Sequence, residues 1–380
     1  PQGDRVAVGQ GAVLTVQDLA KTNGPVFVQA EAHPEGIQSV AWSPDGKTLV
    51  TGGFRRMRFW DAATGSPRGG WTNGLVGRIR ALAFAPNGVT LAVADGVEGR
   101  AGRVRLVPWQ DPSRSPVSWK AHADSIFDLE FSADGSRLVT AGADHRVRVW
   151  NPATREEVAT LEGHTAQVFA AAFNTNATQV VSGGADRQIK VWDIATREKL
   201  VTLGNPASGV PGVAWPADSS TVFTASESGA VHRYTQLKSH SGEQSSATAD
   251  EKHLGDLASG AVCLSASTNG SRIAVGGQDG SVRVWDRDGK LLGSWVGVSN
   301  TPAISQGTSL VKGPSKPTRS KVSTTKGTLK SSDVVTLAVE PAEIVLTGDA
   351  LSQGMVVTAT LRDGFEVDAT AVARFSVNRG

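Results

Sequence analysis

Apolar and polar residues alternate in short runs along about the first 300 positions, and Asn, Asp, Gly or Pro separate the runs. The clearest example comprises Gln167–Phe173, Gln179–Gly183, Gln188–Trp192 and Lys199–Thr202. A period of two residues predicts strands with one buried face, and short polar turns predict hairpins. This stretch therefore predicts a four-stranded antiparallel meander.

The same pattern occurs in the preceding stretch at a fixed distance. Four side chains return 42 residues later (164 − 122 = 42), as the pairs His122 and His164, Thr140 and Ser182, Asp144 and Asp186, and Trp150 and Trp192. A repeat of about 40 residues that contains four short strands is typical of a β-propeller blade. The chain from Ala121 to Asp193 therefore predicts two consecutive blades.

The repeated residue types can form one chain of hydrogen bonds. Asp accepts from His, the His contacts the hydroxyl of Ser or Thr, and the hydroxyl contacts the indole N–H of Trp. Each bond contributes about 0.5–1.5 kcal/mol, and an unmet buried partner costs about 1–3 kcal/mol. Gly163-His164 and Val191-Trp192-Asp193, with Ser182 and Asp186 between them, resemble a WD repeat. The resemblance implies a β-propeller fold.

Matching the remaining segments to this repeat gives seven blades within residues 1–297. Pro1–Gly9 aligns with Pro44–Gly52, so the first blade begins after its innermost strand and runs to about Ala32. Either this end is a fragment boundary, or a strand from the C-terminal side completes the blade. The second, third, sixth and seventh blades are degenerate copies (33–71, 73–120, 204–258 and 259–297). Lys238–Lys252 in the sixth predicts a surface loop.

The composition changes after Gly297. Residues 298–332 contain no acidic residue and carry Lys and Arg among Ser, Thr, Pro and Gly, which predicts a disordered linker. Residues 333–380 alternate again, and Val339-Glu340-Pro341 and Leu346-Thr347-Gly348 are similar to segments of bacterial immunoglobulin-like domains of group two. The prediction is an all-β chain: a seven-bladed β-propeller with an incomplete first blade, a linker, and part of an immunoglobulin-like β-sandwich.

Composition excludes several classes of function. The formal net charge of +2 gives no general reason to expect nucleic acid or a membrane surface as partner, and the linker lacks aromatic residues for base stacking. Cys263 is the only cysteine, so an internal disulfide framework is excluded. No apolar run approaches the ~18 residues that a transmembrane helix needs. No histidine falls in a Cys/His ligand spacing, and no phosphate-binding loop is present, so we expect neither metal nor cofactor.

Ser182, His164 and Asp186 are also the residue types of a hydrolase triad. A catalytic triad is built once, whereas this set recurs at His122, Thr140 and Asp144, each time beside a Trp. We therefore interpret both sets as structural tetrads, and we expect no catalytic residue.

The surface offers a candidate binding site. In a propeller of this kind, the hairpins between second and third strands share one face with the segments leading into the inner strands. The candidate partner-binding residues on this face are Arg55, Arg56, Arg146, Arg187 and the channel-mouth residues Phe127 and Phe169. Arg and aromatic residues are enriched at interface hot spots. These side chains are either solvated loop residues or a docking face for an acidic partner.

These observations favour a protein-interaction scaffold that binds a protein or peptide, which could be another domain of the same chain. The domain order also resembles large modular proteins of planctomycete-type bacteria. That resemblance implies an alternative, in which the chain is the scaffold segment of a cell-envelope protein with an upstream haem-c domain and redox or degradative chemistry elsewhere. It favours the cell envelope or periplasm over the cytoplasm.

Overall fold

The computed structural model describes residues 4–20, 25–29, 31–97, 99–111, 114–216, 221–235, 249–296, 334–340, 356–361 and 366–368. The chain divides into two compact units, Pro1–Ile304 and Ser305–Gly380. All regular secondary structure in the described residues is β-strand.

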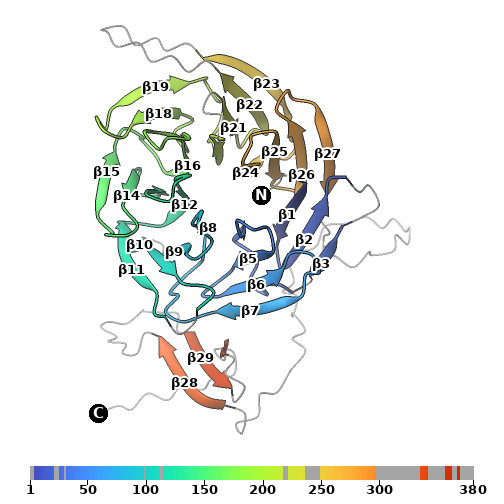
Figure 1. Cartoon of the computed structure of the whole chain (residues 1–380), viewed down its shortest axis with the longest axis vertical. Coiled ribbons are helices and arrows are strands. Elements are labelled where there is room, and N and C mark those ends of the chain that lie inside the picture. The colour runs from blue at the N-terminus through green and yellow to red at the C-terminus, as the bar shows by residue number, and fades with distance from the viewer. Residues whose placement is uncertain are drawn as a thin grey trace, which may run out of the picture. The chain divides into compact units, whose positions relative to one another are not determined.

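The first unit contains seven antiparallel sheets arranged as the blades of a ring (Figure 1). Blade 1 consists of β1 (Arg5–Gln10), β2 (Val13–Asp18) and β3 (Phe27–Gln29). Blade 2 has β4 (Ser39–Trp42), β5 (Thr48–Gly52), β6 (Met57–Asp61) and β7 (Pro67–Trp71), and blade 3 has β8 (Ala81–Phe84), β9 (Leu91–Val97), β10 (Ala101–Val107) and β11 (Val117–His122). The prediction of a seven-bladed propeller is confirmed.

The remaining blades have four strands each. Blade 4 has β12 (Ile126–Phe131), β13 (Leu138–Gly142), β14 (Val147–Trp150) and β15 (Glu157–Leu161), and blade 5 has β16 (Val168–Phe173), β17 (Gln179–Gly184), β18 (Ile189–Asp193) and β19 (Lys199–Leu203). Blade 6 has β20 (Gly212–Ala214), β21 (Thr221–Ala225), β22 (Ala230–Thr235) and β23 (Asp250–Asp256), and blade 7 has β24 (Ala261–Ala266), β25 (Arg272–Gly277), β26 (Ser281–Asp286) and β27 (Leu291–Val296).

Blade 1 has three strands among the described residues. Its strand β1 occupies the second-strand position, as the alignment of Pro1–Gly9 with the second blade predicted. The loop predicted over Lys238–Lys252 extends too far at its C-terminal end, and its residues 238–248 lie outside the described residues. Asp250–Lys252 belong to β23, where Glu251 pairs with Tyr234 and Lys252 with Arg233. Propensity missed this strand because its residues are polar and its pairing is set by the neighbouring strand.

The core lies between neighbouring blades. The second strands of blades 2 to 6 are mostly buried, as in β13, because a sheet covered on both faces admits apolar residues at every position. Trp192 of blade 5 packs with Val139 and Val149 of blade 4 in one such cluster. Between the last and first blades, Arg272 Nη1 donates to Asp4 Oδ1 at 3.0 Å. The alternating pattern of the sequence therefore becomes a ring of stacked sheets.

The second unit contains one described sheet. β28 (Val334–Glu340), β29 (Val356–Leu361) and β30 (Glu366–Asp368) pair antiparallel in chain order. Three strands do not define an immunoglobulin-like sandwich, so that resemblance remains a prediction. The predicted linker 298–332 lies outside the described residues.

Candidate functional site

The tetrad of blade 5 forms a continuous hydrogen-bonded chain. His164 Nδ1 lies 2.9 Å from both carboxylate oxygens of Asp186, and His164 Nε2 lies 2.8 Å from Ser182 Oγ. Trp192 Nε1 donates to Ser182 Oγ at 2.8 Å. The Asp186 carboxylate also accepts from the Thr165 backbone N–H at 3.1 Å. The chain ties the second and third strands of the blade to the segment before its first strand.

The tetrad of blade 4 has the same geometry. His122 Nδ1 lies 2.7 Å from Asp144 Oδ1, His122 Nε2 lies 2.7 Å from Thr140 Oγ1, and Trp150 Nε1 donates to Thr140 Oγ1 at 3.0 Å. Arg148 Nη1 donates to Asp144 Oδ2 at 3.0 Å. Blade 4 therefore reproduces the arrangement of blade 5, with the Arg148 guanidinium as an additional cation hydrogen-bonded to the carboxylate.

The partners fix the direction of every bond in these chains. A carboxylate only accepts, so each His donates from Nδ1 to Asp, and the indole N–H donates to the hydroxyl oxygen. In the neutral ring, which a lowered pKa favours, Nε2 then accepts the hydroxyl proton. Burial lowers the pKa of His122 and of His164, although the neighbouring carboxylates oppose this shift. Burial by itself would raise the pKa of the Asp186 carboxyl. The pKa is nevertheless lowered, chiefly by the hydrogen bond from His164.

The tetrads are closed to substrate. The side chains of Ser182 and Thr140 are 0 % exposed, and each hydroxyl oxygen already accepts an indole N–H. A nucleophile must reach the substrate carbonyl, and no group can approach these oxygens without opening the blade. Both hydroxyl groups are therefore engaged in hydrogen bonds inside their blades.

Blade 2 carries an incomplete tetrad. His33 Nε2 lies 2.9 Å from Thr51 Oγ1, and Trp60 Nε1 donates to the same oxygen at 2.9 Å. The hairpin Phe54-Arg55-Arg56 supplies no carboxylate, and His33 Nδ1 is buried without a partner among the described residues. Burial, followed by the nearby Arg58, lowers the pKa of His33 to about 4.

The predicted docking residues lie at one end of the blades. Strand connections in a meander alternate between its two ends, so the hairpins between second and third strands share one side of the ring, here termed the hairpin face. Arg187 is exposed at the tip of its hairpin, whereas Arg55 and Arg56 are half-buried. Arg55 Nε donates to the Leu75 carbonyl oxygen at 3.4 Å.

Arg146 already has an acidic neighbour. Its Nε donates to Glu162 Oε1 at 2.8 Å, and both side chains are partly exposed. This pair could not be predicted from the sequence, because the two residues lie on separate loops. An exposed ion pair contributes about 0–1 kcal/mol, so an acidic partner can replace Glu162 at little cost.

The structure brings Phe127 and Phe169 together at the channel mouth. Their rings meet edge to face with centroids 5.5 Å apart, and both remain partly exposed. The Arg80 guanidinium lies over the Phe127 ring, 5.3 Å from its centroid. All three side chains line the central channel, whose volume is about 1320 Å³. The two Phe residues were predicted from the sequence, whereas Arg80 was not, because blade 3 lacks the motif that gives the register.

Blade 3 replaces the tetrad with an ion pair. Arg105 Nε and the Val76 backbone N–H both donate to Asp95 Oδ2 at 3.0 Å. The Asp95 side chain is 0 % exposed. Among the described residues, Asp95 Oδ1 has no hydrogen-bond partner. Asp95 falls outside the WD-type spacing, so the pattern gave no signal for it.

The described residues offer neither a metal-ligand cluster nor a membrane-spanning helix. No group of three His, Cys, Asp or Glu side chains within the described ranges could hold a metal ion. In the same part of the chain, no helix is long and apolar enough to cross a membrane.

Comparison with known proteins identifies the repeats. The family model for the WD40 repeat (WD domain, G-beta repeat) matches residues 25–61, 114–151, 155–193 and 251–286. The chain therefore contains WD40 repeats in a seven-bladed β-propeller. WD40 propellers are typically protein-interaction scaffolds and typically non-enzymatic.

Three similar proteins illustrate the range of relatives. The chain is 26 % identical over 130 residues to a WD repeat-containing protein WDS homolog of Arabidopsis thaliana, 33 % of this chain and 24 % of the relative. It is 26 % identical over 142 residues to anaphase-promoting complex subunit cdh1 of Dictyostelium discoideum, 36 % and 18 % respectively. It is 31 % identical over 120 residues to protein groucho of Drosophila melanogaster, 30 % and 15 %. The matched part thus spans a quarter or less of each relative.

Proposed function

We propose that this propeller is a non-catalytic platform that binds a protein or peptide partner through its hairpin face. The observation that carries the proposal is the cluster of Arg80, Phe127 and Phe169 at the channel mouth. Partly exposed aromatic and Arg side chains are the types enriched at interface hot spots. These three side chains are partly exposed at the channel and are not needed to pack one blade against the next. Their exposed surface is therefore available for contact with a partner.

The charge of the face indicates an acidic partner. Arg187 is exposed on the hairpin of blade 5. Arg146 on blade 4 pairs with Glu162 in a solvent-accessible ion pair, which an acidic group of a partner can replace at little cost. Guanidinium groups bind carboxylates in a bidentate geometry and lose their hydration more readily than ammonium groups. One relative is named as a subunit of the anaphase-promoting complex, which agrees with an assembly role for propellers of this type.

Differential capture from an extract of the source cells tests the proposal. The double variant Phe127→Ser/Phe169→Ser is compared with the parent chain and with Arg155→Glu. Arg155 is exposed on a turn between third and fourth strands, at the opposite end of blade 4. We expect the parent and Arg155→Glu to retain the same proteins and the double variant to lose them. Equal capture by all three would place the binding site elsewhere.

A further inference from the structure

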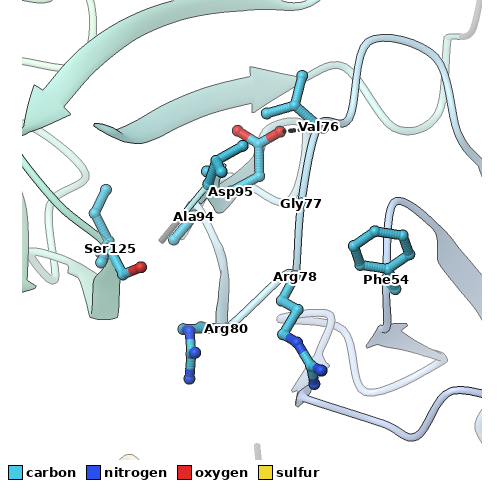
Figure 2. Close-up of a pocket in the computed structure, with 11 residues that line it drawn as sticks. Phe54, Val76, Gly77, Arg78, Arg80, Ala94, Asp95 and Ser125 are labelled. Atoms are coloured by element: carbon cyan, nitrogen blue, oxygen red, sulfur yellow. Dashed lines mark hydrogen bonds between the residues drawn. The ribbon is translucent and has the colours of Figure 1, made fainter. Parts of the chain in front are cut away.

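A pocket of about 290 Å³ lies on the hairpin face beside the channel mouth (Figure 2). Blade 2 contributes Phe54, and blade 3 contributes its strand β9 and the segment before β8. Ser125 and Ile126 of blade 4 close the third side. The volume is at the lower end of the range for ligand pockets, so it suits one side chain better than a whole cofactor.

The rim of the pocket is apolar and open to solvent. Phe54 is 40 % exposed, Val76 is 42 % exposed and Val97 is 44 % exposed. These three are among the ten large hydrophobic residues that are exposed within the described residues, and all three line this one pocket. Scattered surface hydrophobics are ordinary, whereas apolar side chains gathered around a hollow indicate a contact surface.

The walls are fixed by backbone contacts. Phe54 and Arg78 form an antiparallel bridge, and the Ile79 N–H donates to the Gly53 carbonyl oxygen at 3.0 Å. A Cβ on Gly77 would lie 1.8 Å from the Gly96 carbonyl oxygen, so only glycine permits this approach. The pocket therefore needs little reorganisation before it binds.

Positive charge lies at one side of the pocket. Figure 2 shows the Arg78 and Arg80 side chains extending from one segment in a common direction, away from Asp95. Asp95 is already paired with Arg105, so its charge does not cancel that of Arg78. The nearby Asp124 carboxylate accepts the Gly99 and Ser125 backbone N–H groups. Arg78 is exposed and makes no ion pair with the described residues.

We infer that this pocket receives an apolar side chain from a peptide segment of a partner protein, while a carboxylate beside that side chain pairs with Arg78. The inference rests on the proposed function and specifies the partner chemistry. The apolar rim selects the anchor residue, and the guanidinium groups select the acidic neighbour. The segment then continues toward Arg80 and the channel mouth.

Fluorescence anisotropy with the whole 380-residue chain tests the inference. The probes are labelled peptides in a Gly/Ser background, centred on Leu-Glu-Glu, Ile-Asp-Glu or Phe-Glu-Glu. We expect replacement of the apolar residue by Ser, or of the acids by Gln, to weaken the best binder by about tenfold. Arg78→Glu should weaken it by about tenfold and Phe54→Ala by about fivefold. Arg155→Glu should remain within about twofold of the parent, and circular dichroism verifies that each variant is folded.

Three outcomes of the peptide assay would overturn the inference. One is that no peptide binds below about 1 mM. Another is that the Ser-substituted peptide binds as tightly as its parent. The third is that octanoate binds in an Arg78-dependent manner while no peptide does, which would assign the pocket to a small anionic amphiphile. If a captured partner responds to Phe127→Ser/Phe169→Ser but not to Arg78→Glu, the pocket is rejected and the docking face stands.

Discussion

Trp192 Nε1 donates a hydrogen bond to Ser182 Oγ at 2.8 Å inside a blade where both side chains are almost completely buried. The contact joins the third strand to the second and completes a chain that begins at Asp186. Ser182 is therefore held by its neighbours and shielded from any substrate. The repeated His, Ser or Thr, Asp and Trp residues thus form one hydrogen-bonded chain in each of blades 4 and 5.

Removal of Trp192 is expected to cost more than removal of one polar partner. Trp192→Ala leaves a cavity and removes the indole donor to Ser182 Oγ, and should lower the free energy of unfolding by about 3–5 kcal/mol. Asp186→Ala should cost about 1–3 kcal/mol, because His164 Nδ1 then lacks an acceptor. Urea titration followed by tryptophan fluorescence for Asp186→Ala, and by circular dichroism for both variants, gives the comparison. A larger loss for Asp186→Ala would mean that hydrogen bonding, and not packing, dominates the blade.

Acid should destabilise the propeller partly through His33. Burial and then Arg58 lower its pKa from 6.5 to about 4, so the folded state favours the neutral ring. A depressed pKa contributes stability above the unfolded value that is lost as the pH falls through the folded value. The free energy of unfolding should therefore decrease from about pH 6.5 to 4, at up to roughly 1.4 kcal/mol per pH unit for this proton. His33→Gln should make the decrease shallower, and an unchanged slope would contradict the assignment.

The opposite dependence is expected from Glu130. Burial, followed by the charge of Asp128, raises the pKa of Glu130 from 4.5 to about 8, so the folded state favours the protonated acid. A raised pKa contributes stability below the unfolded value that is lost as the pH rises through the folded value. Glu130→Gln keeps an acceptor for the Phe173 N–H, which donates to Glu130 Oε1 at 3.2 Å.

At pH 8, Glu130→Gln should stabilise the chain by about 1 kcal/mol, a value reduced because the side chain is only half-buried. The exposed Glu198→Gln serves as the matched control and should have no effect of this kind. Thermal melting at pH 5 and pH 8 measures both. A Glu130→Gln variant that is less stable than the parent at pH 8 would show that the ionised carboxylate is the form that the fold requires.

The sequence predicted the ring and the two complete tetrads because their information is local and periodic. Trp150 and Trp192 lie at the same sequence distance from the His, hydroxyl and Asp residues of their own tetrads. The predicted ends of each strand of blade 5 lie within one residue of the observed ends. Alternation and turn residues determine such features without reference to the rest of the chain.

Features that depend on approach in space could not be predicted. The pocket requires Gly77 to lie against the Gly96 carbonyl, and blade 3 has lost the motif residues that would have set its register. The pair between Arg146 and Glu162 joins two loops whose distance no pattern encodes. Strand β23 is polar, so its pairing with β22 overrides its own propensity.

The most direct test of the docking face is the salt dependence of its association with a captured partner. Reversal of charge in Arg146→Glu/Arg187→Glu is compared with Arg155→Glu at about 50 and 300 mM salt, by titration calorimetry or anisotropy. We predict that the double reversal weakens binding at least tenfold at low salt, mainly through slower association, and that the difference shrinks at high salt, while Arg155→Glu matches the parent. Equal binding of the double reversal and the parent at low salt would contradict the account.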